Sequence, residues 1–284
     1  MRADIVISLI VLAMFSGGMG DTSSTVAPAD YVALGSSFAA GPDVGRPDPT
    51  GPKPCARSLD NYAHQLAARR GLSLEDRTCS GAKTEDIVTR HQFGLPPQIE
   101  AIGPMTRLVT VTIGGNDVSY LGDLSAASCR NQGDATCRTS PSETLEARFS
   151  NLREALASML TEVKARAPKA KVVVVDYVTI APSSGVCPDR TPLTEQDMNW
   201  ARARAARLRQ ITAEVASDAG AILVKASDLS AEHDVCAAEP WVNGWRKLGP
   251  SGRPLAAYHP RSAAMEAIAA EIDRVLPKSL SASK

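Results

Sequence analysis

The strongest constraint on the fold is a run of four valines, from Val172 to Val175, inside the apolar segment 171–180. An unbroken β-branched run indicates a strand buried on both faces, as in a parallel sheet covered by helices. Shorter apolar runs are predicted to form the other strands of the same sheet, at residues 31–34, 72–78, 108–113 and 221–224.

Amphipathic helical patterns alternate with these strands. Apolar residues recur at helical spacing over residues 145–163 and 201–215, and arginines occupy the solvated face of the second segment. Residues 61–70 and 260–275 are predicted as further helices, with Pro260 in the first turn of the last one. Strand–helix alternation implies right-handed crossovers, so we expect an α/β fold, a three-layer α/β/α sandwich around a parallel five-stranded sheet.

Three segments rich in Gly, Pro, Ser or Asp are predicted as ordered loops, at residues 41–57, 120–141 and 226–256. Each of them holds or borders cysteines. Ligands of open parallel sheets bind beyond the carboxyl ends of the strands. The loops that follow the first, third and fourth strands are therefore expected to line a functional site.

The amino terminus has the features of a secretory signal peptide. An apolar run at residues 5–15, broken only by Ser8, follows Arg2 and leads into small residues. This run is shorter than the roughly 20 residues that a helix needs to cross a bilayer, and an uncleaved membrane tether is the alternative. We predict a signal peptide at residues 1–20, a linker at 21–29 and one domain at 30–284.

All six cysteines follow this signal peptide, and an even count in an exported chain indicates disulfides. Six cysteines allow fifteen connectivities. The simplest connectivity joins neighbours, as Cys55–Cys79, Cys129–Cys137 and Cys187–Cys236. A zinc site is the alternative, which the lack of any C-x-x-C motif disfavours.

Composition argues against two classes of partner. Lysine plus arginine and aspartate plus glutamate number 31 each, so no net charge attracts nucleic acid or anionic lipid. Aromatic residues make up 4% of the chain, which leaves few platforms for stacking bases.

Ser36 and Ser37 follow the first predicted strand and Gly35, and a helical Phe-Ala-Ala follows them. A hydroxyl on a turn at the edge of a sheet is placed for nucleophilic catalysis when a base lies within reach. The alternative reading is that one of these serines only caps the helix.

Gly114-Gly115-Asn116-Asp117 directly follows the predicted strand 108–113. Paired glycines let the backbone approach a ligand closely, and an Asn amide can donate to a developing oxyanion. A plain turn is the alternative. Gly81, after the second predicted strand, offers an unobstructed backbone N–H as a second donor, although loop glycines are often structural.

His259 is the candidate base, because it opens the last predicted helix next to small residues. The alternative is an ordinary surface histidine near a helix start. The chain holds three other histidines: His64 in a helical pattern, His91 beside a Gly- and Pro-containing stretch, and His233 in a polar loop.

In chain order, these segments resemble the four sequence blocks of the SGNH hydrolases, also called the GDSL esterase/lipase family. The family's blocks supply a serine, a glycine, an asparagine and a histidine. The matching stretches are Gly35-Ser36-Ser37-Phe38, Cys79-Ser80-Gly81, Gly114-Gly115-Asn116-Asp117 and His259-Pro260. The resemblance covers about residues 30–275. The cysteine layout is similar to that of the secreted actinobacterial branch, whose members carry three disulfides.

The resemblance implies a flavodoxin-like sandwich with Ser37 as the nucleophile and His259 as the general base. The backbone N–H groups of Ser37 and Gly81 and the side chain of Asn116 would form the oxyanion hole. The implied function is a secreted serine esterase or lipase that hydrolyses carboxylic acyl esters through an acyl-enzyme. It would act on a small-molecule or lipid ester, with no metal and no organic cofactor. We expect a monomer without stable membrane insertion.

Two positions depart from the family pattern. Ser36 stands where the family usually has an aspartate before the nucleophile, so the turn is either looser or held by the Ser36 hydroxyl. Ala256 stands where the family usually has the aspartate of a triad, three residues before the histidine. Some secreted relatives orient the histidine with a backbone carbonyl, and we predict a Ser–His dyad in which the carbonyl of Ala256 does so. Asp228 or Asp234 is the alternative third member.

Two other functions use the same residues. An acyltransferase or a carbohydrate deacetylase would keep the chemistry and change the acceptor or the substrate. The loss of two family aspartates also leaves the hypothesis of a catalytically inactive ligand-binding protein.

Overall fold

The computed structural model describes residues 29–133, 137, 144–246, 249, 252 and 255–281. The predicted signal peptide at residues 1–20, and the predicted linker apart from Ala29, lie outside the described residues.

A parallel sheet with the strand order β2-β1-β3-β4-β5 forms the centre of the molecule. This order is the flavodoxin-like one and confirms the predicted fold class. The strands are β1 (Tyr31–Gly35), β2 (Leu74–Asp76), β3 (Leu108–Thr112), β4 (Lys171–Val175) and β5 (Ile222–Val224).

Two strands, β2 and β4, are shorter than predicted by more than one residue, because their flanking residues bond elsewhere. After β4, the Asp176 carboxylate accepts hydrogen bonds from the backbone and hydroxyl of Ser227, and the Thr179 N–H donates to Ser230 Oγ. After β2, the Asp76 carboxylate accepts from the backbone and hydroxyl of Thr78.

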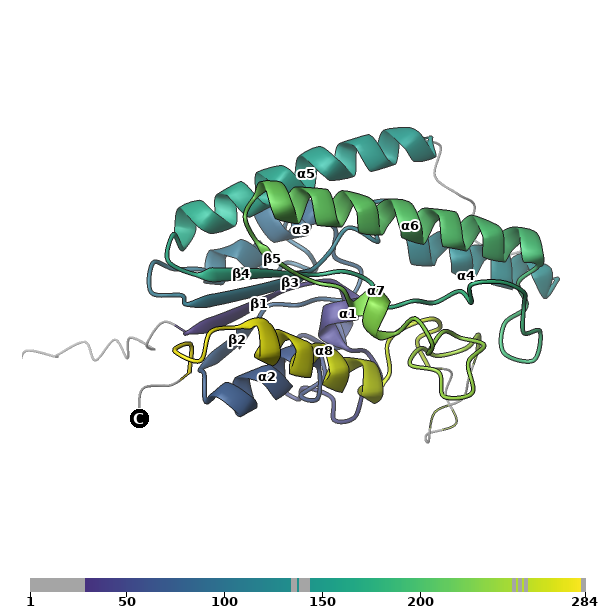
Figure 1. The fold of residues 1–284 in the computed structure, drawn as a ribbon, viewed down its shortest axis with the longest axis horizontal. Coiled ribbons are helices and arrows are strands. Elements are labelled where there is room, and N and C mark those ends of the chain that lie inside the picture. Colours follow the sequence, from purple (N-terminus) through teal and green to yellow (C-terminus); the bar gives the residue numbers. More distant parts are fainter. Residues whose placement is uncertain are drawn as a thin grey trace, which may run out of the picture.

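Helices cover both faces of the sheet (Figure 1). One face carries α3 (Thr84–Val88), α5 (Leu145–Arg166) and α6 (Glu195–Asp218), and the other carries α2 (Tyr62–Arg70) and α8 (Ser262–Val275). The shorter elements are α1 (Ser37–Ala40), α7 (Ala226–Leu229) and the 3₁₀ turns Lys53–Cys55 and Gln98–Ala101.

Local sequence explains where the helices begin. The side chains of Asn61 and Thr144 cap α2 and α5, and Thr194 forms a capping box with Asp197 at the start of α6.

The prediction of a loop at residues 120–141 is wrong for its first half, which forms α4 (Tyr120–Asn131). Gly122 and the serines of this segment lower its helix propensity, but tertiary burial outweighs propensity. Tyr120 and Leu124 are buried, and the Asp123 carboxylate pairs with Arg204 of α6 and Arg148 of α5.

Pro260 does not lie in the first turn of the last helix, as the sequence predicted. The helix begins at Ser262, and Arg261 is its N-cap residue. The preceding residues are held as extended chain, because Val242 and Pro260 form a β-bridge and the Asn243 N–H donates to the carbonyl of His259. The helix therefore starts only after this bridged segment.

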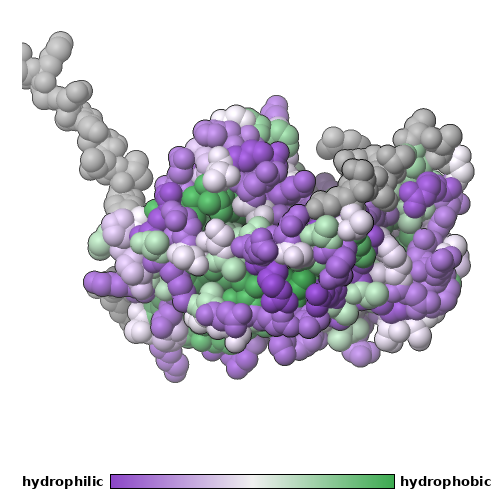
Figure 2. Space-filling model, turned by 90° about the horizontal axis from the view of Figure 1, so that it is seen from above, coloured by the Kyte–Doolittle hydropathy of each residue, from purple (hydrophilic) through white to green (hydrophobic). Residues whose placement is uncertain are grey.

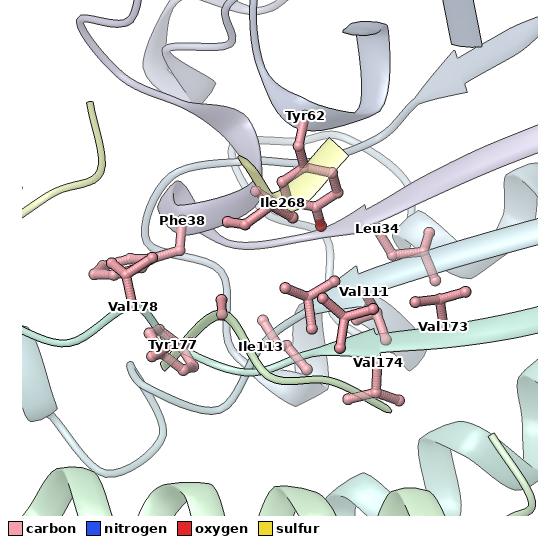
Figure 3. Close-up of a cluster of buried hydrophobic side chains, with 14 of the residues drawn as sticks. Leu34, Phe38, Tyr62, Val111, Ile113, Val173, Val174, Tyr177, Val178 and Ile268 are labelled. Carbon is pink, nitrogen blue, oxygen red and sulfur yellow. The ribbon is translucent and has the colours of Figure 1, made fainter. Parts of the chain in front are cut away.

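The apolar core continues from the sheet to the turn that follows β1 (Figure 3). Leu34, Val111 and Val174 are register partners on adjacent strands, and Ile268 of α8 belongs to the same buried cluster. Beyond the strand ends, the rings of Phe38 and Tyr177 meet with their centroids 4.7 Å apart. The face of the molecule seen in Figure 2 is mostly hydrophilic, with separate apolar patches.

Three disulfides join the pairs Cys55–Cys79, Cys129–Cys137 and Cys187–Cys236, which is the connectivity of sequence neighbours. Cys55–Cys79 and Cys187–Cys236 each tie a predicted loop segment to another part of the chain, and Cys129–Cys137 lies within the predicted loop 120–141. Among the described residues, no helix has both the length and the apolar character needed to cross a bilayer.

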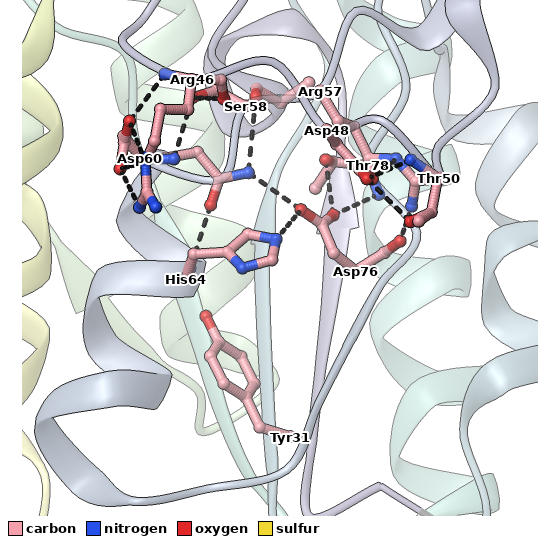
Figure 4. A network of polar contacts seen from close by, with 12 residues as sticks. Tyr31, Arg46, Asp48, Thr50, Arg57, Ser58, Asp60, His64, Asp76 and Thr78 are labelled. Atoms are coloured by element: carbon pink, nitrogen blue, oxygen red, sulfur yellow. Dashed lines mark hydrogen bonds and ion pairs between the residues drawn. The ribbon is translucent and has the colours of Figure 1, made fainter.

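A buried polar network surrounds Asp76 at the end of β2 (Figure 4). In addition to the bonds from Thr78, the carboxylate accepts from Asn61 Nδ2 at 2.8 Å and lies 3.5 Å from His64 Nε2. The Arg57 guanidinium donates to the backbone carbonyl of Asp76. This network connects β2, the start of α2 and the loop that bears Cys55.

Replacement of Asp76 by alanine should therefore destabilise the fold by about 2–3 kcal/mol, because the buried donors of Thr78 and Asn61 lose their acceptor. Urea unfolding followed by circular dichroism measures the change. Asp60→Ala is the matched control, since Asp60 pairs with the exposed Arg46, and it should cost less than about 1 kcal/mol. Equal losses in the two variants would contradict this role of Asp76.

Candidate active site

The turn after β1 requires glycine at position 35. A Cβ atom on Gly35 would lie 2.5 Å from the carbonyl oxygen of Thr112 and 2.9 Å from the Cβ of Ala39. The close approach lets the Ser36 N–H donate to that Thr112 oxygen at 2.9 Å. The chain then turns into α1 with Ser37 as its first residue.

Neither serine acts as the helix cap of the alternative reading. Ser36 occupies the N-cap position of α1, but no side-chain capping bond is present. The hydroxyl of Ser37 instead bonds to His259, with Oγ 2.8 Å from Nε2.

The side chain of Gln98 bonds to both backbone groups of Gly35 in the same turn, a contact that sequence reasoning missed. Its Oε1 accepts from the Gly35 N–H at 2.8 Å, and its Nε2 donates to the Gly35 carbonyl at 3.1 Å. Gln98 lies in a 3₁₀ turn between two prolines and an apolar segment, where its sequence carries no signal of this contact.

Tyr177 connects the turn to the Gly-Gly-Asn-Asp segment. Its phenolic oxygen accepts from the Gly115 N–H at 2.7 Å and also shares a hydrogen bond with the Ser36 hydroxyl. Burial raises the pKa of Tyr177 to about 12, so the phenol stays neutral. A Cβ on Gly115 would lie 2.8 Å from the Tyr177 ring, which explains the glycine. The Ser36 hydroxyl therefore holds the turn, one of the two outcomes expected at this position.

The orienting contact to His259 differs from the prediction. His259 Nδ1 lies 2.8 Å from the carbonyl oxygen of Ala257, whereas the carbonyl of Ala256 accepts from Asn243 Nδ2. Tyr258 between them has φ 62°, and this left-handed kink places the later carbonyl beside the imidazole. The prediction of Ala256 as the orienter is wrong for this reason.

The hydrogen bonds of His259 assign its tautomer. A carbonyl oxygen can only accept, so Nδ1 carries the proton that Ala257 receives. Nε2 is then free to accept from the Ser37 hydroxyl. This arrangement is that of a general base that has not yet taken its proton.

The alternative third members, Asp228 and Asp234, bond elsewhere. Asp228 pairs with Lys225 at 3.7 Å, and Asp234 Oδ1 accepts from the Cys236 N–H at 2.7 Å. The carboxylate that acts on His259 is Asp43, through its charge and without a direct bond. Asp43 Oδ2 accepts from the Ala256 N–H at 2.7 Å, a contact that sequence reasoning missed.

Burial is the main influence on the imidazole and lowers the pKa of His259 below the ordinary 6.5. The bond to Ala257 and the negative charge of Asp43 oppose this shift. The ring also lies against Phe38, with centroids 5.3 Å apart. His259 is therefore neutral at pH 7 and able to accept a proton.

Two of the residues predicted to form an oxyanion hole lie together. Ser37 and Asn116 line the same small hollow. Asn116 Nδ2 donates one proton to the carbonyl of Ala82 at 2.9 Å, which leaves its second N–H available. In the described part of the chain, no backbone acceptor engages the N–H of Ser37 or of Gly81.

Two contacts hold the Gly81 loop beside the nucleophile turn. The Cys79 N–H donates to the Gly35 carbonyl at 3.0 Å. The Asp117 carboxylate accepts from the backbone and hydroxyl of Thr84, and burial raises the pKa of Asp117. Asp117 thus joins the second and third sequence blocks.

The other histidines bond away from Ser37. His64 lies in the network around Asp76, and His91 is exposed. His233 stacks on Trp241 with ring centroids 4.2 Å apart, and its Nδ1 bonds to the Glu239 carbonyl. Among the described residues, no group of three or more His, Cys, Asp or Glu side chains has the arrangement of a metal site.

Comparisons with known proteins show the family of the chain. The family model described as the GDSL-like lipase/acylhydrolase family matches residues 33–267. Lipase 2 of Streptomyces coelicolor is 36% identical over an alignment of 266 residues, which covers 86% of this chain and 87% of that protein.

Two solved structures are similar over most of the chain. The phospholipase A1 of Streptomyces albidoflavus has a TM-score of 0.70 and 25% identity, covering 88% of this chain and 100% of its own. The extracellular lipase of Streptomyces rimosus has a TM-score of 0.63 and 26% identity, covering 87% and 99%.

The titration of His259 tests its buried position. Its NMR midpoint should lie below 6.5, because burial disfavours the imidazolium. The imidazole of the unfolded chain then binds a proton more readily than that of the folded chain. The folded state therefore loses stability as the pH falls below the pKa that His259 has in the unfolded chain. His259→Gln should reduce the loss of unfolding free energy between about pH 7 and about pH 5 by up to about 1.4 kcal/mol per pH unit. A midpoint above 6.5 would contradict this assignment.

Proposed function

The chain belongs to the GDSL-like lipase/acylhydrolase family and is a carboxylic ester hydrolase, and from this premise we propose that it works through a Ser37–His259 dyad. The observation that carries the proposal is the 2.8 Å hydrogen bond between Ser37 Oγ and His259 Nε2. These atoms belong to residues 222 positions apart in the chain.

In the first half of the reaction, Ser37 Oγ attacks the ester carbonyl carbon while His259 Nε2 takes the hydroxyl proton. The carbonyl oxygen becomes an oxyanion and receives hydrogen bonds from the N–H groups of Ser37 and Gly81 and from the Asn116 amide. Collapse of this intermediate breaks the bond to the alcohol oxygen. His259 returns its proton to that oxygen, and the acyl group stays on Ser37.

In the second half, a water molecule attacks the acyl-enzyme, and His259 acts again as the base. The carboxylic acid leaves, and Ser37 regains its proton. Every proton and electron pair in these steps moves between the substrate, water, Ser37 and His259, so the proposal calls for no metal or organic cofactor.

A neutral carbonyl replaces the carboxylate of a triad in this mechanism. The Ala257 oxygen fixes the tautomer and orientation of His259, but it stabilises the imidazolium less than a bonded carboxylate would. The charge of Asp43 supplies part of the missing stabilisation from a longer distance.

We further propose that the protein is secreted. Support comes from the predicted signal peptide at residues 1–20, from three disulfides and from the similarity to an extracellular lipase. Disulfides persist mainly in oxidising compartments outside the cytosol.

A fluorophosphonate probe and a p-nitrophenyl ester test the nucleophile. The wild type should take the label and cleave the ester, and Ser37→Ala should lose the label and at least about 10³-fold of kcat/KM. Ser184→Ala is the control, because it removes an exposed hydroxyl outside the nucleophile turn and should keep the label. A wild type that takes no label and cleaves no ester would favour a catalytically inactive binding protein.

Asn116→Ala should lower kcat by about 10²–10³-fold, since one oxyanion donor is lost. Asn131→Ala is the control, because the Asn131 amide bonds to Pro192 and Asp197 at the far end of α4. Steady-state kinetics on one ester compares the two variants. An Asn116 variant with wild-type kcat would remove Asn116 from the oxyanion hole.

Substitution of the two alternative carboxylates, Asp228 and Asp234, tests whether the site is a dyad. Asp228→Asn and Asp234→Asn should each keep kcat/KM within about twofold of the wild type, because neither side chain bonds to His259. A loss of about 10³-fold or more in one of them, the size expected for a missing triad member, would show that it completes a triad.

A further inference from the structure

A second hollow, which shares no lining residue with the hollow that contains Ser37 and Asn116, is rich in positive charge. It lies where the loop after β4, the loop before α8 and the start of α8 meet, and its volume of about 560 Å³ is within the range of small-molecule sites. Its charged lining residues in the described part of the chain are Asp189, Arg190, Arg246 and Arg261. The equal numbers of positive and negative charges in the whole chain therefore give way here to a local excess of positive charge.

Arg190 and Arg261 are each held by backbone carbonyls on one side of the guanidinium only. Arg190 Nη1 donates to the carbonyls of Val235 and Ala237, and Arg261 Nη1 donates to the carbonyl of Pro240 at 2.9 Å. The opposite edge of a guanidinium carries the Nε–H and one Nη2–H, a fork that matches two oxygens of a phosphate or carboxylate. In the part of the chain that the structure describes, this fork has no hydrogen-bond acceptor on either arginine.

The carboxylate in the lining does not neutralise this charge. Asp189 is exposed, and the ion pairs among the described residues include neither Asp189 nor the three arginines. Burial lowers the pKa of the Arg261 guanidinium, and the positive charge of Arg190 lowers it further. The two cations thus lie close enough to repel each other, an arrangement that a bound anion would stabilise.

The segments that carry the arginines are joined to one another without a ligand. The Cys187–Cys236 disulfide links the loop of Arg190 to the loop before α8. The Trp245 N–H donates to the Arg190 carbonyl at 2.9 Å, and the Arg261 N–H donates to the Trp241 carbonyl at 2.7 Å. Because the cross-linked loops fix the positions of the two guanidinium groups, little conformational entropy is lost when an anion binds.

The rest of the lining is partly apolar. Val235, Val242 and Trp245 line the hollow together with the arginines, and the Arg246 guanidinium lies over the Trp245 ring, 5.7 Å from its centroid. The hollow is therefore larger than a phosphate group alone requires, and its apolar residues suit an organic group attached to the phosphate.

The number of cations and free donors favours phosphate over carboxylate. A phosphate monoester carries a charge of about −1.5 to −2 at pH 7 and offers three acceptor oxygens. We propose that this hollow is a binding site for a phosphate group, which the guanidinium forks of Arg190 and Arg261 hold while Arg246 adds a third positive charge. Phosphate binding there does not involve Ser37, so it goes beyond the proposed function and does not depend on it.

Isothermal titration calorimetry of the intact protein with inorganic phosphate, at constant ionic strength, tests the site. The wild type should bind phosphate, and Arg261→Gln should raise the Kd by about tenfold or more, because a pair of charged donors is lost. Arg202→Gln is the matched control and should leave the Kd unchanged. Arg202 is also half-buried and donates to a backbone carbonyl, that of Pro182, but Glu195 already pairs with it.

Two further variants separate the contact from the charge and from the fold. Arg261→Lys keeps the positive charge without the fork, so its Kd should lie between those of the wild type and Arg261→Gln. Arg246→Gln changes an exposed side chain and should raise the Kd by about two- to fivefold. Melting curves without phosphate establish that each variant is folded, and the Arg246 variant tests the site even if an Arg261 variant does not fold.

Vesicles distinguish a phosphate group in solution from one on a lipid. Co-sedimentation compares phosphatidylcholine vesicles with and without phosphatidic acid, whose headgroup is a phosphate monoester. Binding that requires phosphatidic acid and is lost in Arg261→Gln would identify a lipid headgroup as the source of the phosphate. Binding of inorganic phosphate without vesicle binding would identify a soluble phosphate ester.

Three results would overturn the inference. The first is a wild type that binds neither inorganic phosphate nor the phosphatidic acid vesicles. The second is an unchanged Kd in both Arg261→Gln and Arg246→Gln, and the third is an equal loss in Arg202→Gln, which would show that binding follows total charge. These measurements involve no ester cleavage, so their failure leaves the proposed function standing, and a failed fluorophosphonate label at Ser37 leaves the phosphate site standing.

Discussion

The close approach of β1 and β3 at their carboxyl ends is the constraint on which the site depends. The Gly35 position leaves no room for a Cβ atom against the Thr112 carbonyl, and the Ser36 N–H uses that same carbonyl. The segments that follow the two strands therefore start side by side. One segment carries Ser37 and the other carries Asn116, so the proposed nucleophile and a proposed oxyanion donor meet at one edge of the sheet.

Cross-links between loops supply the rigidity that regular secondary structure does not provide there. The Gln98 clamp holds Gly35, Tyr177 joins Ser36 to Gly115, and Asp117 joins its own segment to Thr84. Such buried bonds are costly to break, because each would leave a polar group unpaired away from water. The proposed oxyanion donors are thus set in position before a substrate binds, which is what electrostatic stabilisation of a transition state requires.

The dyad shows two opposing influences on one imidazole. Burial lowers the pKa of His259, while the Ala257 carbonyl and the Asp43 charge raise it. A base that is neutral at pH 7 suits the first step of acyl transfer, and nearby negative charge suits the imidazolium that follows. The Ser36 hydroxyl similarly takes over a holding role from the aspartate that the family usually places there, by bonding to a neutral phenol.

Most of the fold and the central pair of the site could be predicted from the amino-acid sequence. The valine run of β4, the five apolar segments and the order of Ser37, Gly81, Asn116 and His259 are local patterns, and a parallel sheet brings strand ends to one edge.

Other features were decided only by the tertiary structure. Segment 120–131 is helical because one of its faces is buried in the protein. In addition, Asp123 forms ion pairs with two arginines on helices that are distant in sequence. The carbonyl that orients His259 is that of Ala257 because Tyr258, whose hydroxyl bonds to Ser128 and Thr191, adopts a left-handed conformation. These outcomes depend on partners far away in the chain, and for that reason local spacing placed the acceptor one residue too early.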